Sequence, residues 1–214
     1  MRLPPVYPIL DTVSVSRTGL SVLEVAEAFL AGGAEILQFR HKDFWSRETF
    51  AAAEQVACLC RDAGVRLFVN DRADYAAMLG AGLHVGQEDL TPVDARCVIG
   101  WEAPLGFSTH NPEQMRAAGS EPVDYVAYGP VFATTSKERP DATVGVEGLA
   151  RVRAMTTKPL VAIGGITLEN AAACWSAGAD SVAVIGSLLQ GGGTPGALRE
   201  RMALFVRTAE ACRM

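Results

Sequence analysis

The first residues whose types could do chemistry lie in the segment Gln-Phe-Arg-His-Lys-Asp, which begins at position 38 directly after an apolar run. In a β-strand, Gln38, Arg40 and Lys42 would project from one face, and Phe39 and His41 from the other. Two cations on one face repel each other unless an anion joins them. Arginine offers phosphate a planar fork and lysine a point charge, so the pattern favours a phosphate or diphosphate site. The alternative is a solvated strand end whose cations pair with surface carboxylates.

Asp71 and Asp89 each stand in a short polar segment that follows an apolar run. If those runs are neighbouring parallel strands, the two carboxylates converge above one end of the sheet. Two hard oxygen ligands with open positions suit Mg²⁺, which takes one or two carboxylates together with water and substrate phosphate. Each carboxylate alone could instead cap the helix that follows it. Their joint position beside the two cations of the first segment favours the metal.

A long polar segment, residues 133–145, follows the sixth apolar run and contains Thr134, Thr135, Ser136 and Lys137. Hydroxyl groups, backbone amides and a cation together suit a phosphate, and a segment of this length could also close over a site as a lid. The alternative is a polar loop without a function.

Glycines end the last two apolar runs, in the sequences Gly164-Gly165 and Gly186-Ser187. Glycine lets backbone N–H groups approach phosphate oxygens closely. In eight-stranded barrels, phosphate sites often lie in the loops after strands seven and eight.

Eight short apolar runs alternate with eight segments of helical periodicity along the chain. The predicted strands are 6–10, 35–40, 66–70, 83–86, 104–108, 125–130, 160–164 and 181–185, and the predicted helices are 21–31, 47–63, 74–79, 92–98, 112–118, 146–155, 168–177 and 195–211. Thr91, Asn111 and Thr194 each precede a proline, which is typical of a capped helix start. The pattern predicts an α/β fold, a (β/α)8 TIM barrel, whose functional groups lie at the carboxyl ends of the strands. An open doubly wound sheet usually carries a GxGxxG turn after its first strand, and none follows the first run here.

Composition narrows the class of protein. The 214 residues, 49% of them hydrophobic, suit one domain spanning residues 1–214, and the net charge of -5 argues against a nucleic-acid partner. Five cysteines without a CxxC pair indicate reduced thiols. No apolar run is long enough to span a bilayer, so we expect a soluble, cytoplasmic protein with small-molecule partners and no membrane partner. A homo-oligomer is compatible with the sequence.

The three histidines do not form a recognisable catalytic group. His41 faces away from the cation row and His84 lies inside the fourth predicted strand, so both are interpreted as packing or supporting residues. His110 follows a strand end without an obvious carboxylate partner. No Ser/His/Asp or Cys/His arrangement is present in the pattern.

Taken together, these motifs resemble those of the thiamine-phosphate synthase family, also called thiamine-phosphate pyrophosphorylase, over nearly the whole chain. The motifs that carry the resemblance are 38–42, 70–72, 84–89, 108–111, 124–125, 129–132, 134–137, 162–166 with Asn170, and 183–185. The resemblance implies a (β/α)8 transferase that joins a hydroxymethylpyrimidine diphosphate to a thiazole phosphate in thiamine biosynthesis. The products are thiamine phosphate and diphosphate.

The resemblance also implies roles for individual residues. The residues implied for the pyrimidine diphosphate are Gln38, Phe39, Arg40, His41, Lys42, Asn70, Ser108 and Lys137. Those implied for the thiazole phosphate are Thr134, Thr135, Ser136, Gly165, Ile185 and Gly186. Asp71 and Asp89 would bind Mg²⁺. Arg40, Lys42 and Lys137 would be catalytic, because they stabilise charge on the departing diphosphate, and no general base is required.

Position 186 departs from the family pattern, which usually has serine there. Backbone contacts would survive this change, whereas a side-chain hydroxyl contact would be lost.

Two alternatives remain open. A thiazole tautomerase of the same fold has an acid–base histidine directly before the Val-Phe pair at 131–132, where this chain has Pro130. A non-catalytic binding or regulatory barrel would be indicated by loss of Asp71, Asp89, Arg40 or Lys137, and all four are present.

Overall fold

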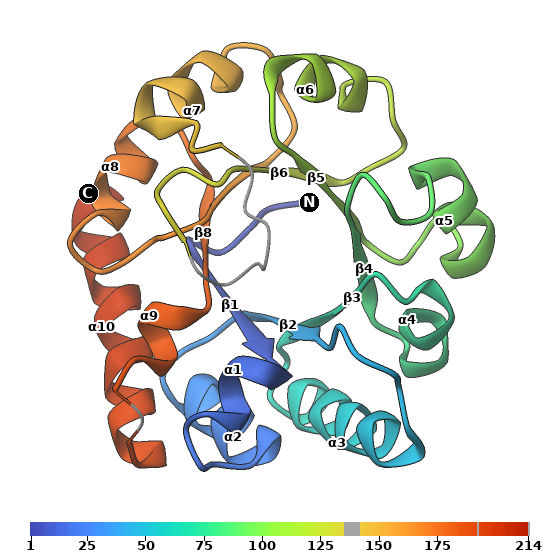
Figure 1. Cartoon of the computed structure of the whole chain (residues 1–214), viewed down its shortest axis with the longest axis vertical. Helices are drawn as coiled ribbons and strands as arrows, with labels where there is room; N and C mark the ends of the chain where they lie inside the picture. The colour runs from blue at the N-terminus through green and yellow to red at the C-terminus, as the bar shows by residue number, and fades with distance from the viewer. Residues whose placement is uncertain (135–141, 192, 214) are drawn as a thin grey trace.

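The computed structural model describes residues 1–134, 142–191 and 193–213. Its eight parallel strands form a closed barrel in sequence order, and β8 pairs with β1 to close it (Figure 1). The strands are β1 (Val6–Asp11), β2 (Ile36–Arg40), β3 (Arg66–Asn70), β4 (Gly82–Val85), β5 (Leu105–Thr109), β6 (Tyr125–Tyr128), β7 (Leu160–Ile163) and β8 (Ser181–Val184). The (β/α)8 fold predicted from the sequence is confirmed.

Helices surround the barrel. Within the described residues they are α1 (Thr12–Ser16), α2 (Val22–Ala31), α3 (Arg47–Asp62), α4 (Ala73–Leu79), α5 (Pro92–Ile99), α6 (Pro112–Ala118), α7 (Gly145–Arg153), α8 (Ala171–Ser176), α9 (Gly186–Leu189) and α10 (Pro195–Arg213). The sequence pattern predicts eight of these and misses α1 and α9. Helices of five and four residues are too short to show a helical period.

The predicted helix starts are confirmed by their caps. The side chain of Thr91 accepts a hydrogen bond from the third residue of α5, and that of Asn111 does the same at α6. Pro92 and Pro112 occupy the first turns, where a missing N–H costs nothing. The Thr194 hydroxyl likewise accepts an N–H at the start of α10.

Alternation along the strands divides the core into two layers. Tyr7, Phe68 and Tyr125 point into the barrel and pack in an interior cluster, whereas Phe39 lies in the larger cluster between the sheet and the helices. Gln38 is buried on the interior side, so the alternation predicted for this strand is confirmed.

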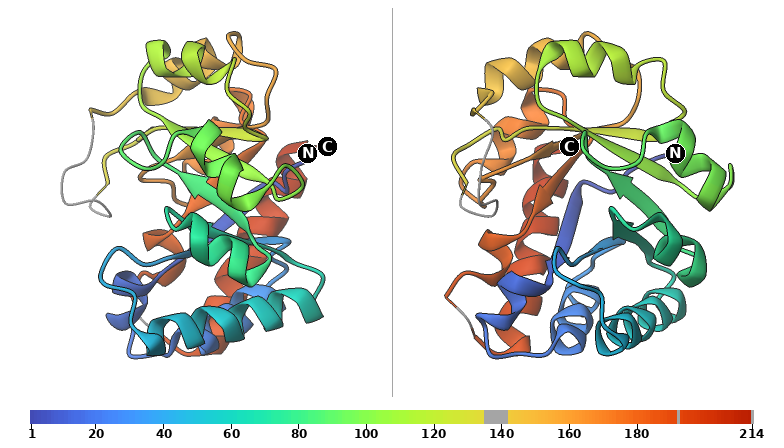
Figure 2. Two further views of the ribbon diagram at one scale, coloured as in Figure 1. Left: turned by 90° about the vertical axis from the view of Figure 1, so that its right-hand side faces the viewer. Right: turned by 45° about the vertical axis from the view of Figure 1, so that its right-hand side comes forward.

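The loops after the carboxyl ends of the strands gather on one face, and both chain termini lie toward the opposite face (Figure 2). We call the first face the mouth. None of the described helices is both long and apolar enough to cross a membrane.

Candidate active site

Two cations at the mouth are each paired with a carboxylate from a neighbouring strand. Arg40, the last residue of β2, forms an ion pair with Asp11, the last residue of β1. Lys42, two residues farther along, pairs with Asp71 just beyond β3. The cations therefore do not face each other unscreened, since each is held by its own carboxylate.

Asp11 was missed by the sequence interpretation. One of its carboxylate oxygens caps α1 by accepting from the backbone N–H and the hydroxyl of Ser14, at 2.9 and 2.7 Å. The other oxygen binds Arg40. The position of Asp11 indicates a site residue, because an acidic residue at the carboxyl end of the first strand reaches the mouth in the same way as Asp71 after β3 and Asp89 after β4.

Asp71 and Asp89 come together as expected from the sequence. The pKa of Asp71 is raised from 3.8 to about 6, mainly by burial and in part by the Asp89 carboxyl, while Lys42 opposes the shift. The Asp89 carboxylate accepts the Gly86 N–H at 2.7 Å, which fixes its direction. Two crowded carboxylates are stabilised by a divalent cation between them, so their donor chemistry fits Mg²⁺. No cluster of three or more His, Cys, Asp or Glu ligands occurs among the described residues.

The capping alternatives for these carboxylates are wrong. Helix α4 begins after Arg72 and has no side-chain cap, and α5 is capped by Thr91. Asp71 has a backbone φ of +65°, the left-handed region that a non-glycine residue enters at a cost of about 1–3 kcal/mol. Its N–H donates to the His84 carbonyl at 2.8 Å, which helps hold this conformation.

The structure places the pyrimidine residues implied by the resemblance around the same strands. Asn70 ends β3 with its Nδ2 atom buried and without a hydrogen-bond partner among the described residues. Ser108 lies near the end of β5 and is half-buried. Phe39 is fully buried against Trp45, so a ligand contact there would come from its backbone.

His41 is turned away from the cations. Its Nδ1 lies 2.8 Å from the Thr12 hydroxyl, and its Nε2 donates to the Phe44 carbonyl at 3.2 Å. It also packs edge-on against Trp45. These contacts support the interpretation of His41 as a packing residue that orders the loop after β2.

The other side of the mouth is built from glycine and backbone. Gly165 has φ +63°, and a Cβ there would lie 2.3 Å from the Ala133 carbonyl oxygen. The N–H of Val131 donates to the Ile163 carbonyl at 2.8 Å, and that of Phe132 to the Gly164 carbonyl at 3.0 Å. The chain leaving β6 therefore rests directly on the end of β7, and only glycine allows this approach.

Asn170 holds the glycine turn in place. Its Nδ2 donates to the Gly165 carbonyl at 3.0 Å, and its Oδ1 accepts the Thr167 N–H at 2.8 Å. Ile185 is half-buried and Gly186 exposed at the start of α9. Thr134 is half-buried, whereas Thr135, Ser136 and Lys137 lie outside the described residues.

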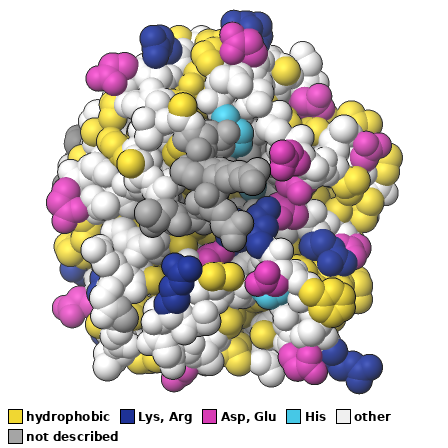
Figure 3. All heavy atoms as spheres, viewed as in Figure 1, with side chains coloured by type: hydrophobic (Ala, Val, Ile, Leu, Met, Phe, Trp, Pro, Cys, Tyr) yellow, Lys and Arg dark blue, Asp and Glu magenta, His cyan; other side chains and the backbone are white. Residues whose placement is uncertain are grey.

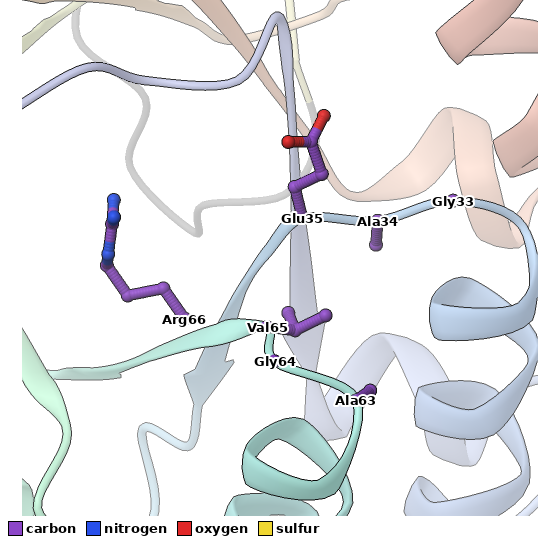
Figure 4. Close-up of a pocket in the computed structure, with 7 residues that line it drawn as sticks. All are labelled: Gly33, Ala34, Glu35, Ala63, Gly64, Val65 and Arg66. Atoms are coloured by element: carbon purple, nitrogen blue, oxygen red, sulfur yellow. The ribbon is translucent and has the colours of Figure 1, made fainter.

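Charged side chains of both signs gather near the centre of the mouth in a space-filling view (Figure 3). A separate depression lies at the amino-terminal ends of β2 and β3, lined by residues 33–35 and 63–66 (Figure 4). Glu35 and Arg66 extend there from the strand starts. Since barrel sites form at the carboxyl ends of strands, the mouth and not this depression is the candidate active site.

Comparison with known proteins agrees with this geometry. The family model described as Thiamine monophosphate synthase matches residues 6–188. The chain belongs to this family. The thiamine-phosphate synthase of Koribacter versatilis is 47% identical over 192 residues, which cover 88% of this chain and 90% of that protein. That of Chloroflexus aurantiacus is 40% identical over 205 residues, covering 95% and 94%. A solved thiamine phosphate pyrophosphorylase from Pyrococcus furiosus superposes with a TM-score of 0.82 at 29% identity, covering 97% and 96%.

The resemblance seen in the sequence is thus confirmed, and with it the assignment of the chain as a thiamine-phosphate synthase, a transferase. The comparisons concern the activity and the fold.

Proposed function

We propose that the mouth binds a hydroxymethylpyrimidine diphosphate and a thiazole phosphate and joins them, releasing diphosphate. The observation that carries this assignment of residues is the pair of ion pairs beside the Asp71–Asp89 couple. A dianionic or more highly charged leaving group needs cations already in place, and Arg40 and Lys42 are positioned before any ligand arrives.

Each residue has a distinct task in this scheme. Gln38, Asn70 and Ser108 hold the pyrimidine, and Arg40 and Lys42 contact the diphosphate from the β2 side. Lys137, which lies outside the described residues, contacts the diphosphate from the loop after β6. The carbon–oxygen bond to the diphosphate breaks and its electron pair leaves with the diphosphate oxygen, while the lone pair of the thiazole nitrogen forms the new carbon–nitrogen bond.

Mg²⁺ is the proposed cofactor, with Asp71 and Asp89 as its protein ligands. When bound, the ion neutralises charge on the diphosphate oxygens as a Lewis acid. The Lys42 ammonium meanwhile neutralises Asp71 and lies within reach of the same phosphates. The raised pKa of Asp71 supports this proposal, because a second cation relieves the repulsion between the two carboxylates.

The thiazole phosphate is assigned to the glycine side of the mouth. The backbone around Gly165, Ile185 and Gly186, with the hydroxyl groups of Thr134, Thr135 and Ser136, would surround its oxygens. The tautomerase alternative is disfavoured because Pro130, at the position of its acid–base histidine, carries no proton that can be transferred.

The test is an assay of purified protein with both substrates and Mg²⁺. We expect thiamine phosphate and diphosphate in equal amounts, and no diphosphate release when Mg²⁺ or the thiazole phosphate is omitted. Absence of thiamine phosphate, together with isomerisation of the carboxylated thiazole phosphate, would overturn the proposal. We further propose a cytoplasmic location, on the basis of the unpaired thiols. Light scattering would measure whether the protein forms a homo-oligomer.

A further inference from the structure

Five polar side chains form one continuous hydrogen-bonded chain through the barrel interior. The Gln38 Nε2 donates to the Tyr7 hydroxyl at 3.2 Å, and this hydroxyl lies 3.1 Å from that of Tyr125. The Tyr125 hydroxyl is 2.8 Å from Nδ1 of His84, whose Nε2 is 2.9 Å from the Ser108 hydroxyl. The two ends of this interior chain, Gln38 and Ser108, are residues that we assign to the pyrimidine.

The middle of the interior chain is buried. Tyr7 and Tyr125 are at most 1% exposed and His84 is 7% exposed. The His84 ring stacks on Tyr125 with centroids 5.5 Å apart. A Cβ at Gly106 would lie 2.3 Å from the Tyr125 hydroxyl oxygen, so the ring occupies space that only glycine leaves open.

The available hydrogen-bond acceptors allow one direction of proton donation along the interior chain. The Tyr7 oxygen accepts from Gln38, and Tyr125 is the one acceptor for the Tyr7 proton among the described residues. Tyr125 therefore accepts from Tyr7 and donates its own proton to Nδ1 of His84. The opposite direction would leave the buried Tyr7 proton without an acceptor, which is costly. Burial raises the pKa of both phenols, so each keeps its proton at neutral pH.

This direction fixes the groups presented at both ends. A His84 ring that accepts at Nδ1 carries its proton on Nε2 and donates it to the Ser108 oxygen. The Ser108 proton is then directed toward the mouth. At the other end, Gln38 has committed its Nε2 to Tyr7, and its carbonyl oxygen remains to accept a hydrogen bond from a ligand.

We propose that Tyr7, Tyr125 and His84 are positioning residues that set this proton direction and thereby select an aminopyrimidine over an oxopyrimidine. The inference rests on the proposed binding of the pyrimidine between Gln38 and Ser108. A 4-aminopyrimidine offers an amino donor and ring-nitrogen acceptors, which match a carbonyl at Gln38 and a hydroxyl proton at Ser108. A 4-oxopyrimidine offers a carbonyl and a ring N–H at these positions, and both contacts become mismatched.

The first experiment compares Tyr125→Phe with Tyr128→Phe. Both remove one phenol oxygen from the same strand, but Tyr128 faces the helices and makes no hydrogen bond to a described residue. Calorimetry would measure the dissociation constants of the 4-amino and 4-oxo pyrimidine diphosphates. We expect Tyr125→Phe to reduce the preference for the amino compound by about tenfold or more, since His84 and Ser108 can then reverse direction. Tyr128→Phe should change the preference less than about twofold.

The second experiment observes His84 directly and does not depend on activity. The chain has three histidines. NMR spectra of the ¹⁵N-labelled protein, compared with those of the single variants His41→Ala and His110→Ala, assign the nitrogen signals of each ring. We expect wild-type His84 at pH 7 to be protonated at Nε2 and unprotonated at Nδ1, and Tyr125→Phe to shift this signature.

The outcomes separate the two proposals. A His84 protonated at Nδ1, or equal loss of preference in Tyr125→Phe and Tyr128→Phe, would overturn the proton direction even in an active synthase. If Tyr125→Phe fails to fold, the wild-type spectrum and the Tyr7→Phe variant, expected to lose preference in the same sense, decide the question. If neither pyrimidine diphosphate binds wild-type protein, the proposed function fails whatever the state of His84.

Discussion

The two sides of the mouth differ in what they offer to a phosphate group. On the β1–β4 side, the groups are charged side chains held by one another, as Arg40 is by Asp11 and Lys42 by Asp71. On the β6–β8 side, the surface is backbone, because the chain leaving β6 rests on the end of β7 at Gly164 and Gly165.

This difference suits the two anions of the reaction. A departing diphosphate gains charge during the reaction, so cations and the proposed Mg²⁺ would stabilise it, whereas a phosphate that only binds would need a fixed set of N–H donors. The β1–β4 side should therefore control turnover and the β6–β8 side should control affinity for the acceptor.

The largest effect is expected at the proposed metal ligands. Asp89→Asn should lower kcat by about 10²–10³-fold, because the metal's share of transition-state stabilisation is several kcal/mol. Steady-state kinetics at saturating Mg²⁺ measure this loss. Asp94→Asn, which changes an exposed carboxylate at the start of α5, is the control and should keep near-normal activity. Unchanged kcat in Asp89→Asn would contradict a catalytic metal on the β1–β4 side.

The next effect concerns the cation after β2. Lys42→Ala should lower kcat by about a hundredfold while the KM for thiazole phosphate changes less than about twofold, since the ammonium acts on the leaving group. Lys42→Arg keeps the charge and should recover part of the rate. If kcat and the thiazole phosphate KM changed equally in Lys42→Ala, the result would contradict the proposed contact of Lys42 with the diphosphate.

A matched pair of glycines tests the other side. Gly165→Ala should raise the KM for thiazole phosphate by about tenfold and destabilise the fold by about 1–3 kcal/mol, because of its positive φ and the clash with the Ala133 carbonyl. Gly186→Ala should do neither, because a Cβ at Gly186 meets nothing within 4 Å. Kinetics and denaturant unfolding measure both. A large fall in kcat at constant KM in Gly165→Ala would contradict the division between the two sides.

Gly186→Ser restores the residue usual in the family. Because the space around Gly186 is open, we expect the serine to be accommodated and the thiazole phosphate KM to fall by less than about threefold. An increase in KM would show that the glycine is required here.

A separate prediction concerns the pH dependence of stability in Mg²⁺-free protein. The pKa of Asp71 is raised from 3.8 to about 6 by burial and by Asp89, so the folded state binds more protons than the unfolded state between these values. The contribution of Asp71 to the free energy of unfolding therefore falls as pH rises from about 4 to 6, by about 1–2 kcal/mol after allowance for partial exposure.

Unfolding by urea at pH 4.5 and pH 7 measures this dependence against a matched variant. Asp71→Asn should remove it and stabilise the Mg²⁺-free protein at pH 7. Asp74→Asn should not, because Arg72 lowers the pKa of Asp74 and its contribution has the opposite sign. A pH dependence that is the same in both variants would mean that Asp71 is not the carboxyl group whose raised pKa causes it.

The sequence predicts the barrel well because buried parallel strands are continuous apolar runs and prolines mark helix starts. It also predicts which polar residues reach the mouth, since strand ends share one face. It misses α1 and α9, which are shorter than a helical period needs, and Asp11, which directly follows the predicted first strand at 6–10.

The interior chain is beyond sequence reasoning for a physical reason. Tyr7 and Tyr125 lie 118 positions apart, and only barrel closure brings their hydroxyls together. The sequence pattern indicates a packing or supporting residue at His84, but the partners of His84 are side chains of other strands. Periodicity indicates which face a residue occupies and not which residue lies opposite.

The most direct test of the division between the two sides is calorimetry of inorganic diphosphate with and without Mg²⁺. We expect diphosphate to bind wild-type protein only when Mg²⁺ is present, Asp89→Asn to abolish this binding, and Gly165→Ala to leave it unchanged. Diphosphate binding that is independent of Mg²⁺, or that is lost in Gly165→Ala and kept in Asp89→Asn, would contradict the account.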